Sequence, residues 1–278
     1  MIARVSGIYD EPELYELACA YRNVPAEVDA LQRWCDRHAG GGADRSGPAG
    51  APRGGVRSVL ELAAGPAEHS LEFARRGLDA TALDRSRAMC ARARGKAGRA
   101  GLELAVVEAD MRDFRIDRGF DLAITMLNSL CHLLTLDDLL AHLGALAAHL
   151  GPGALYVVEL AHPADYLGVA PRTSSEWTTE TDGARIEVRW GGPGDPIDPV
   201  SQVTREHVSV TVRPAVGDVR TVTDVVPNRF WTATEITAAV RLEGSFSVLA
   251  SYGDFDDTTP VGDPRAWRMI LILRRDRP

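Results

Sequence analysis

Cysteine is scarce in this chain, and its few copies are scattered. The 278 residues include four cysteines, with no C-x-x-C pair and no two histidines spaced as H-x-x-x-H. These gaps argue against a disulfide framework and against a metal site, which would need closely spaced ligands. We therefore predict no bound metal, and free thiols in a reducing compartment. The four cysteines are Cys19, Cys35, Cys90 and Cys131.

The sequence also lacks an excess of positive charge and a long apolar run. Its net charge is -8, and an acidic chain repels the phosphate backbone of nucleic acids at long range. No stretch approaches the roughly 18 uncharged apolar residues of a membrane span. Acidic residues appear where a signal peptide would have its apolar core. We expect a cytoplasmic protein that acts on a small molecule, with neither nucleic acid nor membrane as a partner; a homodimer remains open.

What the chain does have is an alternation of helical and strand patterns. Residues 10–38 have an apolar stripe at helical spacing, and residues 40–55 form a Gly- and Pro-rich tract that predicts a flexible loop. From Val56 onward, short apolar runs alternate with helices, which indicates βαβ crossovers and a parallel sheet. The fold class predicted is α/β, a doubly wound, mostly parallel Rossmann-like sheet.

Residues 172–226 have a different pattern, in which apolar and polar residues alternate between turn signals. This pattern predicts an antiparallel meander of about three strands. A helix and two closing strands then follow. We therefore divide the chain into a helical segment at 1–39, the loop at 40–55, one α/β domain at 56–171 and 227–278, and an inserted meander at 172–226 that would lie on the substrate side.

Small and acidic residues follow three successive predicted strands. The first strand ends in Glu61-Leu62-Ala63-Ala64-Gly65-Pro66-Ala67, and small residues there would let backbone approach a nucleotide-type ligand. Asp84 comes 19 residues after Gly65, the usual spacing of a ribose acceptor, although it could also precede a helix as a cap. Asp110 and Met111 follow the third strand and could contact an adenine, or lie in a solvated acidic loop.

The order of these motifs resembles that of class I S-adenosylmethionine-dependent methyltransferases. The resemblance covers Tyr15 to Arg275 apart from the glycine tract, and its most specific stretch is Glu108–Leu133, EADMRDFRIDRGFDLAITMLNSLCHL. It is similar to small-molecule members with an inserted β-meander, such as sugar-amine and glycine/sarcosine N-methyltransferases. The resemblance implies S-adenosylmethionine as cofactor, an N-terminal helical lid over the site, and a role in biosynthesis.

The resemblance also implies cofactor contacts position by position. The lid would approach the cofactor carboxylate, the first turn its methionine end, Asp84 its ribose, and the later positions its adenine and its floor. One departure is that the usual turn has three glycines where this chain has Ala63, Gly65 and Ala67. The implied cofactor residues are Tyr21, Arg22, Glu61, Ala63, Gly65, Asp84, Arg85, Met89, Asp110, Met111, Met126 and Leu127.

His132 is the candidate general base, because an imidazole with a pKa near ~6.5 takes up protons at neutral pH. The alternative is a helix-cap histidine. Tyr15 is a second catalytic candidate, against the alternative of a core aromatic. Further residues after the fourth and fifth strands or in the meander would contact the substrate. They are Asn128, His162, Glu176, Trp177, Arg229 and Trp231.

Three other functions compete with methyl transfer to a nitrogen or oxygen atom of a small molecule. The same fold could catalyse elimination or cyclisation, or bind ligands as a non-catalytic subunit. An NAD-dependent enzyme would need a G-x-G-x-x-G turn, and Ala63-Ala64-Gly65-Pro66-Ala67-Glu68 does not supply one.

Overall fold

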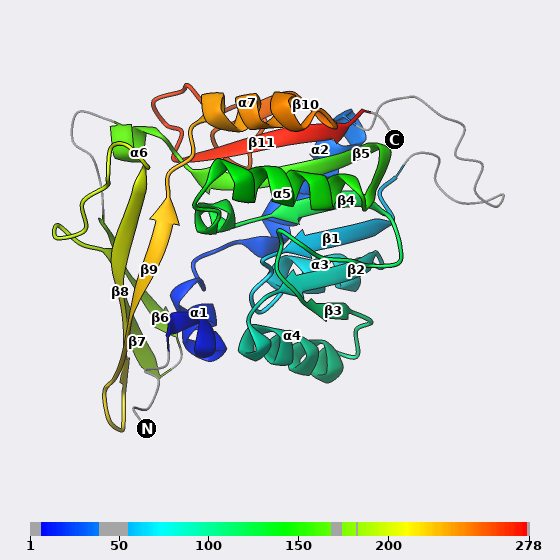
Figure 1. Cartoon of the computed structure of the whole chain (residues 1–278). Helices are drawn as coiled ribbons and strands as arrows, with labels where there is room; N and C mark the ends of the chain where they lie inside the picture. The colour runs from blue at the N-terminus through cyan, green and yellow to red at the C-terminus, as the bar shows by residue number, and fades with distance from the viewer. Residues whose placement is uncertain (1–6, 39–54, 168–173, 182, 277–278) are drawn as a thin grey trace.

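The computed structural model describes residues 7–38, 55–167, 174–181 and 183–276. They form two sheets, a seven-stranded one and a four-stranded one (Figure 1). The predicted flexible loop at 40–55 lies outside the described residues except for Gly55. In the part of the chain that is described, no helix is both long and apolar enough to cross a bilayer.

The seven-stranded sheet has the order β10-β11-β5-β4-β1-β2-β3. β1 to β5 are parallel, whereas β11 pairs antiparallel with both β5 and β10. This confirms the predicted doubly wound α/β fold. The strands are β1 (Ser58–Leu62), β2 (Asp79–Asp84), β3 (Ala105–Glu108), β4 (Phe120–Thr125), β5 (Leu150–Ala161), β10 (Phe246–Tyr252) and β11 (Arg268–Arg275).

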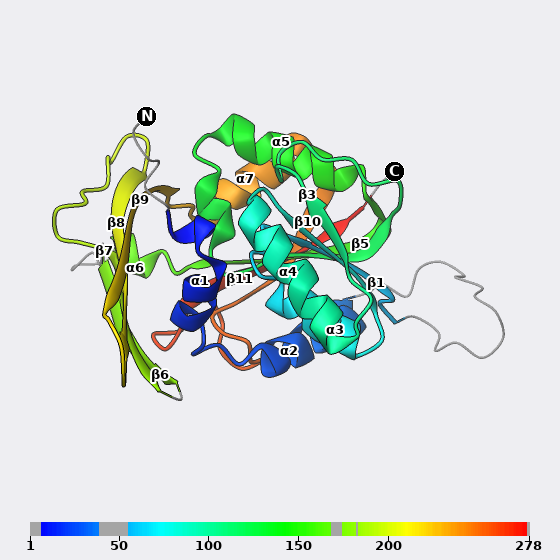
Figure 2. The ribbon, with the colours of Figure 1, turned by 90° about the horizontal axis from the view of Figure 1, so that it is seen from below.

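Helices cover both faces of this sheet, which is why its central strands are apolar almost throughout (Figure 2). One face packs on α5 (Leu136–Ala147) and α7 (Ala233–Glu243), each begun by a Thr capping box. The other packs on α2 (Val24–His38) and α3 (Glu68–Arg75). α4 (Arg87–Ala100) covers the β2–β3 edge.

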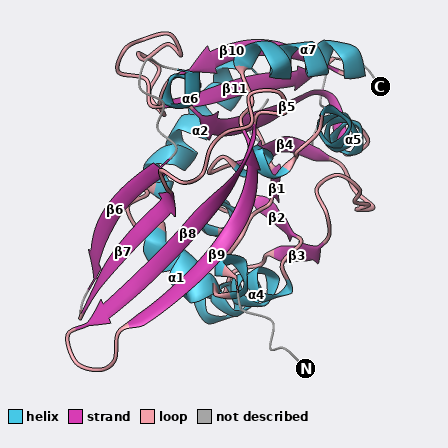
Figure 3. Ribbon diagram, turned by 60° about the vertical axis from the view of Figure 1, so that its left-hand side comes forward, coloured by secondary structure: helices cyan, strands magenta, loops and turns pink. Residues whose placement is uncertain are grey.

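The four-stranded sheet is antiparallel, in the order β6-β7-β8-β9 (Figure 3). It has one strand more than predicted, because the first alternating segment folds into two strands rather than one. Its strands are β6 (Ser174–Thr181), β7 (Ala184–Gly191), β8 (Val203–Pro214) and β9 (Arg220–Arg229).

The N-terminal segment lies between the two sheets. Apolar residues of the 3-10 turn η1 (Ile8–Asp10) and of α1 (Pro12–Ala18) pack against inward-facing valines of β7 and β8. α1 and η1 also contact α4, on the side of the larger sheet. This segment therefore joins the inner face of the small sheet to the carboxyl edge of the large one (Figure 2). Two short turns, η2 (Ser129–His132) and α6 (Ala164–Leu167), follow β4 and β5.

Candidate active site

One cavity of about 960 Å³ lies between the carboxyl ends of the parallel strands and the inner face of the small sheet. β1 is flanked by β4 and β2, so the chain order reverses at this point and the sheet opens a crevice there. The volume is at the upper end of the ~300–1,000 Å³ of single-ligand pockets. There is therefore room for a cofactor against one wall and a small acceptor against the other.

The turn after β1 has an unusual backbone. Ala63, Gly65 and Ala67 all have left-handed conformations, with φ values of 51°, 54° and 62°. L-residues adopt this region at a cost of roughly 1 kcal/mol, and glycine does not. The two alanines that replace glycine in this turn are thus held in the glycine conformation. Gly65 lies against Tyr15, whose Cε1 atom would be 3.7 Å from an added Cβ.

Asp84 joins two loops at the cavity wall. Its Oδ2 accepts a hydrogen bond from the Gly65 N–H, and its Oδ1 from the Ser86 N–H, both at 2.7 Å. Burial raises the pKa of this carboxyl, and the two N–H groups act against that rise. The cap of α4 is Ser86, whose Oγ accepts from the Met89 N–H, so Asp84 itself is not the cap.

The acidic residue that follows β3 also lines the cavity. Asp110 and Met111 line it, as do Arg85 and Met89 from the β2–α4 side. Both oxygens of Asp110 accept hydrogen bonds from the Arg112 guanidinium, at 3.0 and 2.8 Å, and this holds the pKa of Asp110 below its usual range. The charge of Asp110 is thus fixed, but its oxygens are partly occupied.

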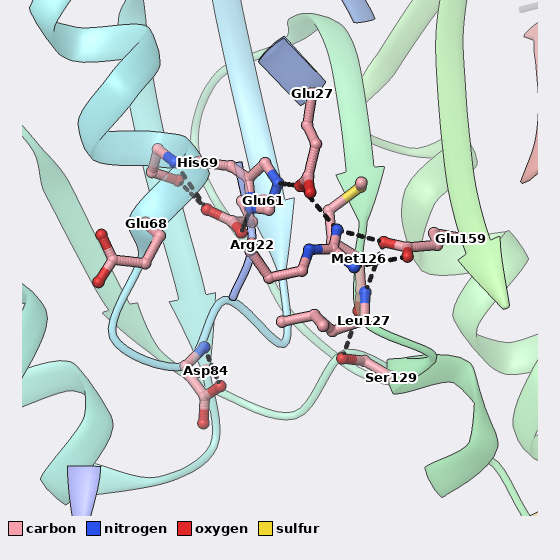
Figure 4. A network of polar contacts seen from close by, with 12 residues as sticks. Arg22, Glu27, Glu61, Glu68, His69, Asp84, Met126, Leu127, Ser129 and Glu159 are labelled. Atoms are coloured by element: carbon pink, nitrogen blue, oxygen red, sulfur yellow. Dashed lines mark hydrogen bonds and ion pairs between the residues drawn. The ribbon is translucent and has the colours of Figure 1, made fainter. Parts of the chain in front are cut away.

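Glu61 and Arg22, two predicted cofactor residues, belong to a buried charged network, and Arg22 is one of its members that line the main cavity (Figure 4). Glu61 accepts from the Ser70 N–H and hydroxyl, at 2.8 and 2.6 Å, and lies 3.4 Å from the His69 ring. It lines a smaller hollow of about 330 Å³, which shares Tyr15, Ala63 and Arg22 with the main cavity. The Glu61 carboxylate therefore orients the start of α3.

Arg22 lies between two carboxylates. Its guanidinium donates to Glu27 at 2.7 Å and to both oxygens of Glu159 at 2.7 and 2.8 Å. His69 contacts Glu27 at 2.8 Å, and its pKa is raised to about 9 by the two glutamates despite burial. The network is nearly neutral overall. Arg22 thus ties the chain between α1 and α2 to β5 and also lines the main cavity, and its predicted contact with a cofactor carboxylate stays a prediction.

Glu159 at the end of β5 is the hub of this network. Besides Arg22 it meets the Arg268 guanidinium at 2.6 Å and accepts from the Leu127 N–H at 3.0 Å. These partners overcome burial and lower its pKa to about 2. Leu127 and Asn128 have left-handed φ values of 54° and 60°, so Glu159 stabilises a strained loop after β4.

Leu127 and Asn128 line the main cavity, whereas Met126 is buried beneath it and lines only the smaller hollow. The Asn128 side chain accepts from the Ala161 N–H at 3.0 Å, which fixes it against β5. Met126 was predicted to line the cofactor floor. Its side chain instead packs into the core on the α2 side of the sheet.

His132 lies in the cavity wall but is a poor base. Its Nε2 is 3.1 Å from the Tyr9 hydroxyl, and the ring also hydrogen-bonds the backbone of Pro227, which offers only a carbonyl. The ring N–H therefore points to Pro227, and Nε2 accepts from Tyr9. Burial and the nearby Arg85 lower the pKa of His132 to about 4. The lowered pKa means that the ring is neutral at pH 7, and its role as a general base stays a prediction.

Tyr9 was missed from the sequence, where it precedes the first helix without a motif around it. Its ring lies across His132 at 5.5 Å and near Trp190 at 6.5 Å. Tyr15 and Tyr21 line the same cavity, and burial raises the pKa of the Tyr9 and Tyr15 hydroxyls well above the usual value. The three tyrosines thus contribute neutral hydroxyl groups.

Among the predicted substrate residues, Asn128 and Trp177 line the cavity, and four others do not. His162 donates its Nε2–H to the Val261 carbonyl at 2.8 Å, and its Nδ1 accepts from the Ala164 N–H at 3.2 Å. Glu176 is exposed and pairs with Arg189 at 2.7 Å on the sheet surface. These contacts turn both side chains away, so neither is retained as a substrate residue.

Arg229 and Trp231 are the other two corrections. Trp231 is buried and donates its indole N–H to the carbonyls of Leu130 and Leu133, at 3.2 and 3.1 Å. Arg229 stacks 3.8 Å over its ring and donates to the Leu134 carbonyl. Both hold η2 and the following loop from behind. The inner sheet also brings Trp190 to the cavity, together with residues that were not predicted: Glu206, Asn228 and, from α6, Tyr166.

Part of the chain is similar in sequence to known proteins. Residues 59–153 match the family model described as a methyltransferase domain. A dTDP-3-amino-3,4,6-trideoxy-alpha-D-glucopyranose N,N-dimethyltransferase of Streptomyces venezuelae is 35% identical over 102 residues. That match spans 37% of this chain and 41% of the relative, about two fifths of its length.

Solved structures match over nearly the whole chain. An S-adenosylmethionine-dependent methyltransferase from Clostridium acetobutylicum has a TM-score of 0.73 at 16% identity, covering 94% of this chain and 95% of its own. DesVI of Streptomyces venezuelae has a TM-score of 0.71 at 23% identity, with 93% and 96% covered. The amino pentose methyltransferase CalS10 scores 0.68 at 21% identity, with 94% and 96% covered. The fold is that of class I S-adenosylmethionine-dependent methyltransferases, and the resemblance predicted from the sequence is confirmed.

Proposed function

We propose that this chain transfers a methyl group from S-adenosylmethionine to the amino group of a small sugar-like acceptor. The observation that carries the proposal is the single cavity in which Asp84, Asp110 and the left-handed turn at Ala63–Ala67 face the inner wall of the inserted sheet. The relatives named above support the choice of acceptor, since two of them are named for methyl transfer to an amino sugar.

The residues on the cofactor wall fit an adenosyl group. Asp84 offers two charged oxygens suited to a pair of ribose hydroxyls. Met89 and Met111 supply apolar faces for an adenine ring, with Asp110 at its edge. The Ala63–Gly65 backbone leaves room for the methionine end. When bound, S-adenosylmethionine supplies a methyl group already activated by its sulfonium.

The chain's own task is then to hold the acceptor in line and to exclude water. An amine attacks only in its neutral form, so it must lose a proton before or during transfer. The Tyr9 oxygen can accept an amine N–H while its own proton is held by Nε2 of His132. With a pKa of about 4, His132 stays neutral at working pH and is not a strong base. The hydroxyl of Tyr9, held by His132, therefore serves to orient the acceptor.

Asp84→Asn tests the cofactor site. The amide keeps the size of the side chain but loses the charge and one acceptor, worth about 1.5–3 kcal/mol for a charged hydrogen bond. We expect at least a tenfold weaker binding of S-adenosylhomocysteine by calorimetric titration. Asp79→Asn, at the exposed start of the same strand, is the matched control and should bind normally. Equal affinities would refute the assignment.

Methyl transfer itself is tested with methyl-labelled S-adenosylmethionine and a thymidine-diphosphate-linked amino sugar. Label in the sugar, at a rate that depends on Asp84, is the expected result. If the protein binds S-adenosylhomocysteine but moves no label to any amine, hydroxyl or thiol acceptor, the methyltransferase proposal fails.

A further inference from the structure

Glu206 is a charged residue in an otherwise neutral row of side chains. It lies on β8, where alternate residues face inward, between Thr204 and Val208. Its side chain is 6% exposed and lines the main cavity on the wall opposite Asp84 and Asp110. A carboxylate at such a position has lost most of its hydration, so its partners decide whether it is stable.

Its partners are neutral. The Asn228 amide on β9 donates to Glu206, and the Trp190 indole on β7 also hydrogen-bonds it. Asn228 in turn accepts from the Cys131 thiol at 3.1 Å. Within the described part of the chain, no arginine, lysine or histidine forms an ion pair with Glu206. The Asn228–Cys131 chain orients the carboxylate but supplies no counter-charge.

The lack of a cationic partner affects the pKa of Glu206. Burial, aided by Asp195, raises the pKa of Glu206 to about 7, against the opposing effect of its two donors. Hydrogen bonds with His207 lower the pKa of Asp195 despite burial, so this neighbour is ionised, whereas the hydroxyl and thiol groups around Glu206 stay protonated at neutral pH because burial raises their pKa well above the usual values. These groups are Tyr9 on η1, Cys131 on η2 and Tyr166 on α6. The acceptor half of the cavity therefore lacks one positive charge.

We propose that Glu206 binds the acceptor's amino group as an ammonium ion and so selects amines over the corresponding alcohols. The inference rests on the proposed function for the existence of an acceptor, and it assigns the residue that recognises it. A hydroxyl group could hydrogen-bond Glu206 but would leave its charge uncompensated. An ammonium ion matches both the charge and the hydrogen-bond capacity of the carboxylate. Before methyl transfer one ammonium proton passes to the Glu206 carboxylate, which leaves a neutral amine to attack and a neutral Glu206.

The test is a binding measurement, which is independent of turnover. Protein saturated with S-adenosylhomocysteine is titrated with a panel of thymidine-diphosphate-linked amino sugars and with the same sugars carrying a hydroxyl in place of the amine. We expect the best amine to bind at least tenfold more tightly than its alcohol. Glu206→Gln should abolish that preference by weakening amine binding alone.

Two controls separate recognition from damage to the fold. Glu176→Gln, on the exposed side of the same sheet, should leave both affinities unchanged. The affinity of Glu206→Gln for S-adenosylhomocysteine should equal that of the wild type. Binding of the amine near neutral pH should also release part of a proton, seen as a dependence of the binding heat on the buffer, because the ammonium lowers the pKa of Glu206. That release should vanish in Glu206→Gln.

Several results would overturn the inference: no amine of the panel binds, alcohols bind as well as amines, or Glu206→Gln keeps the preference. These outcomes are distinct from failure of the proposed function. Amine selection by Glu206 without labelled methyl transfer would leave the recognition intact and refute the enzyme activity. Methyl transfer to an amine at a rate and affinity unchanged by Glu206→Gln would support the enzyme activity and refute the role of Glu206.

Discussion

Buried carboxylates occur on both walls of the cavity, and their surroundings are opposite. On the large sheet, Glu159 meets two arginines, and its pKa falls to about 2. On the small sheet, Glu206 meets an amide, an indole and no cation, and its pKa rises to about 7. Burial disfavours the charge of both. The comparison teaches that compensation by partners, not depth, separates a carboxylate that holds the fold from one that is kept for a ligand.

Removing the charge of Glu159, the carboxylate that is compensated by two arginines, should have the largest effect on the free energy of unfolding. Glu159→Gln leaves Arg22 and Arg268 buried around a neutral amide, and removing one partner of a buried pair costs about 3–5 kcal/mol. We expect a loss of that size in the free energy of unfolding, measured by urea denaturation at neutral pH. Glu176→Gln, which breaks an exposed pair with Arg189, should cost less than about 1 kcal/mol. Similar losses in the two variants would contradict the contrast.

Removing the charge of Glu206, the carboxylate without a cationic partner, should change the free energy of unfolding in the opposite direction. The folded-state pKa of Glu206 lies above its ordinary value of 4.5, so its contribution to stability is complete below that pH and is lost as pH rises through about 7. At pH 8, Glu206→Gln should therefore be more stable than the wild type, by up to about 3 kcal/mol at about 1.4 kcal/mol per pKa unit. Urea unfolding from pH 4.5 to 8 measures the difference. A variant destabilised throughout that range would show that Glu206 is structural.

The smallest expected effect concerns the strained turn after β1, on the large-sheet wall of the cavity. Ala63 has a φ of 51°, where an L-residue costs roughly 1 kcal/mol and glycine costs nothing, although glycine loses more backbone entropy on folding. Ala63→Gly should therefore raise the unfolding free energy by at most about 0.5 kcal/mol, with affinity for S-adenosylhomocysteine preserved. Thermal unfolding and titration would measure both. A loss above about 1 kcal/mol would mean that the alanine methyl packs rather than strains.

Much of the larger sheet could be predicted from the sequence, because its elements rest on local patterns. Apolar runs marked the parallel strands, and Thr135 and Thr232 lie at helix starts as capping residues do. Residues 174–191 were harder to interpret. The sequence has a turn signal at Asp182-Gly183, but the segments on its two sides were counted together, and the pairing of β6 with β7 separates them. The domain boundaries proposed from the sequence stay predictions.

The site was predictable only where a residue's role follows from its place at a strand end. Asp84 and Asp110 reach the cavity for that reason. The pKa of His132 depends on its burial and on Arg85, 47 residues away in the chain, so no local pattern could report it. Glu206 did leave a signal, as an acid in the inward phase of an alternating strand. That signal becomes informative only once the inner face is known to border a cavity.

The small sheet is inserted into the chain as one continuous segment, and this has a consequence for how such proteins diversify. The chain leaves the large sheet after β5 and returns through β9 to α7, and both β5 and β9 contact η2. One contiguous stretch of gene thus encodes most of the acceptor wall, including Glu206. Mutation or recombination within it can change the proposed acceptor site while the carboxyl edge of the large sheet is inherited intact. The segment carrying Ile8 and Leu14 packs against that wall and η2 contacts it, so changes within the wall must stay compatible with both.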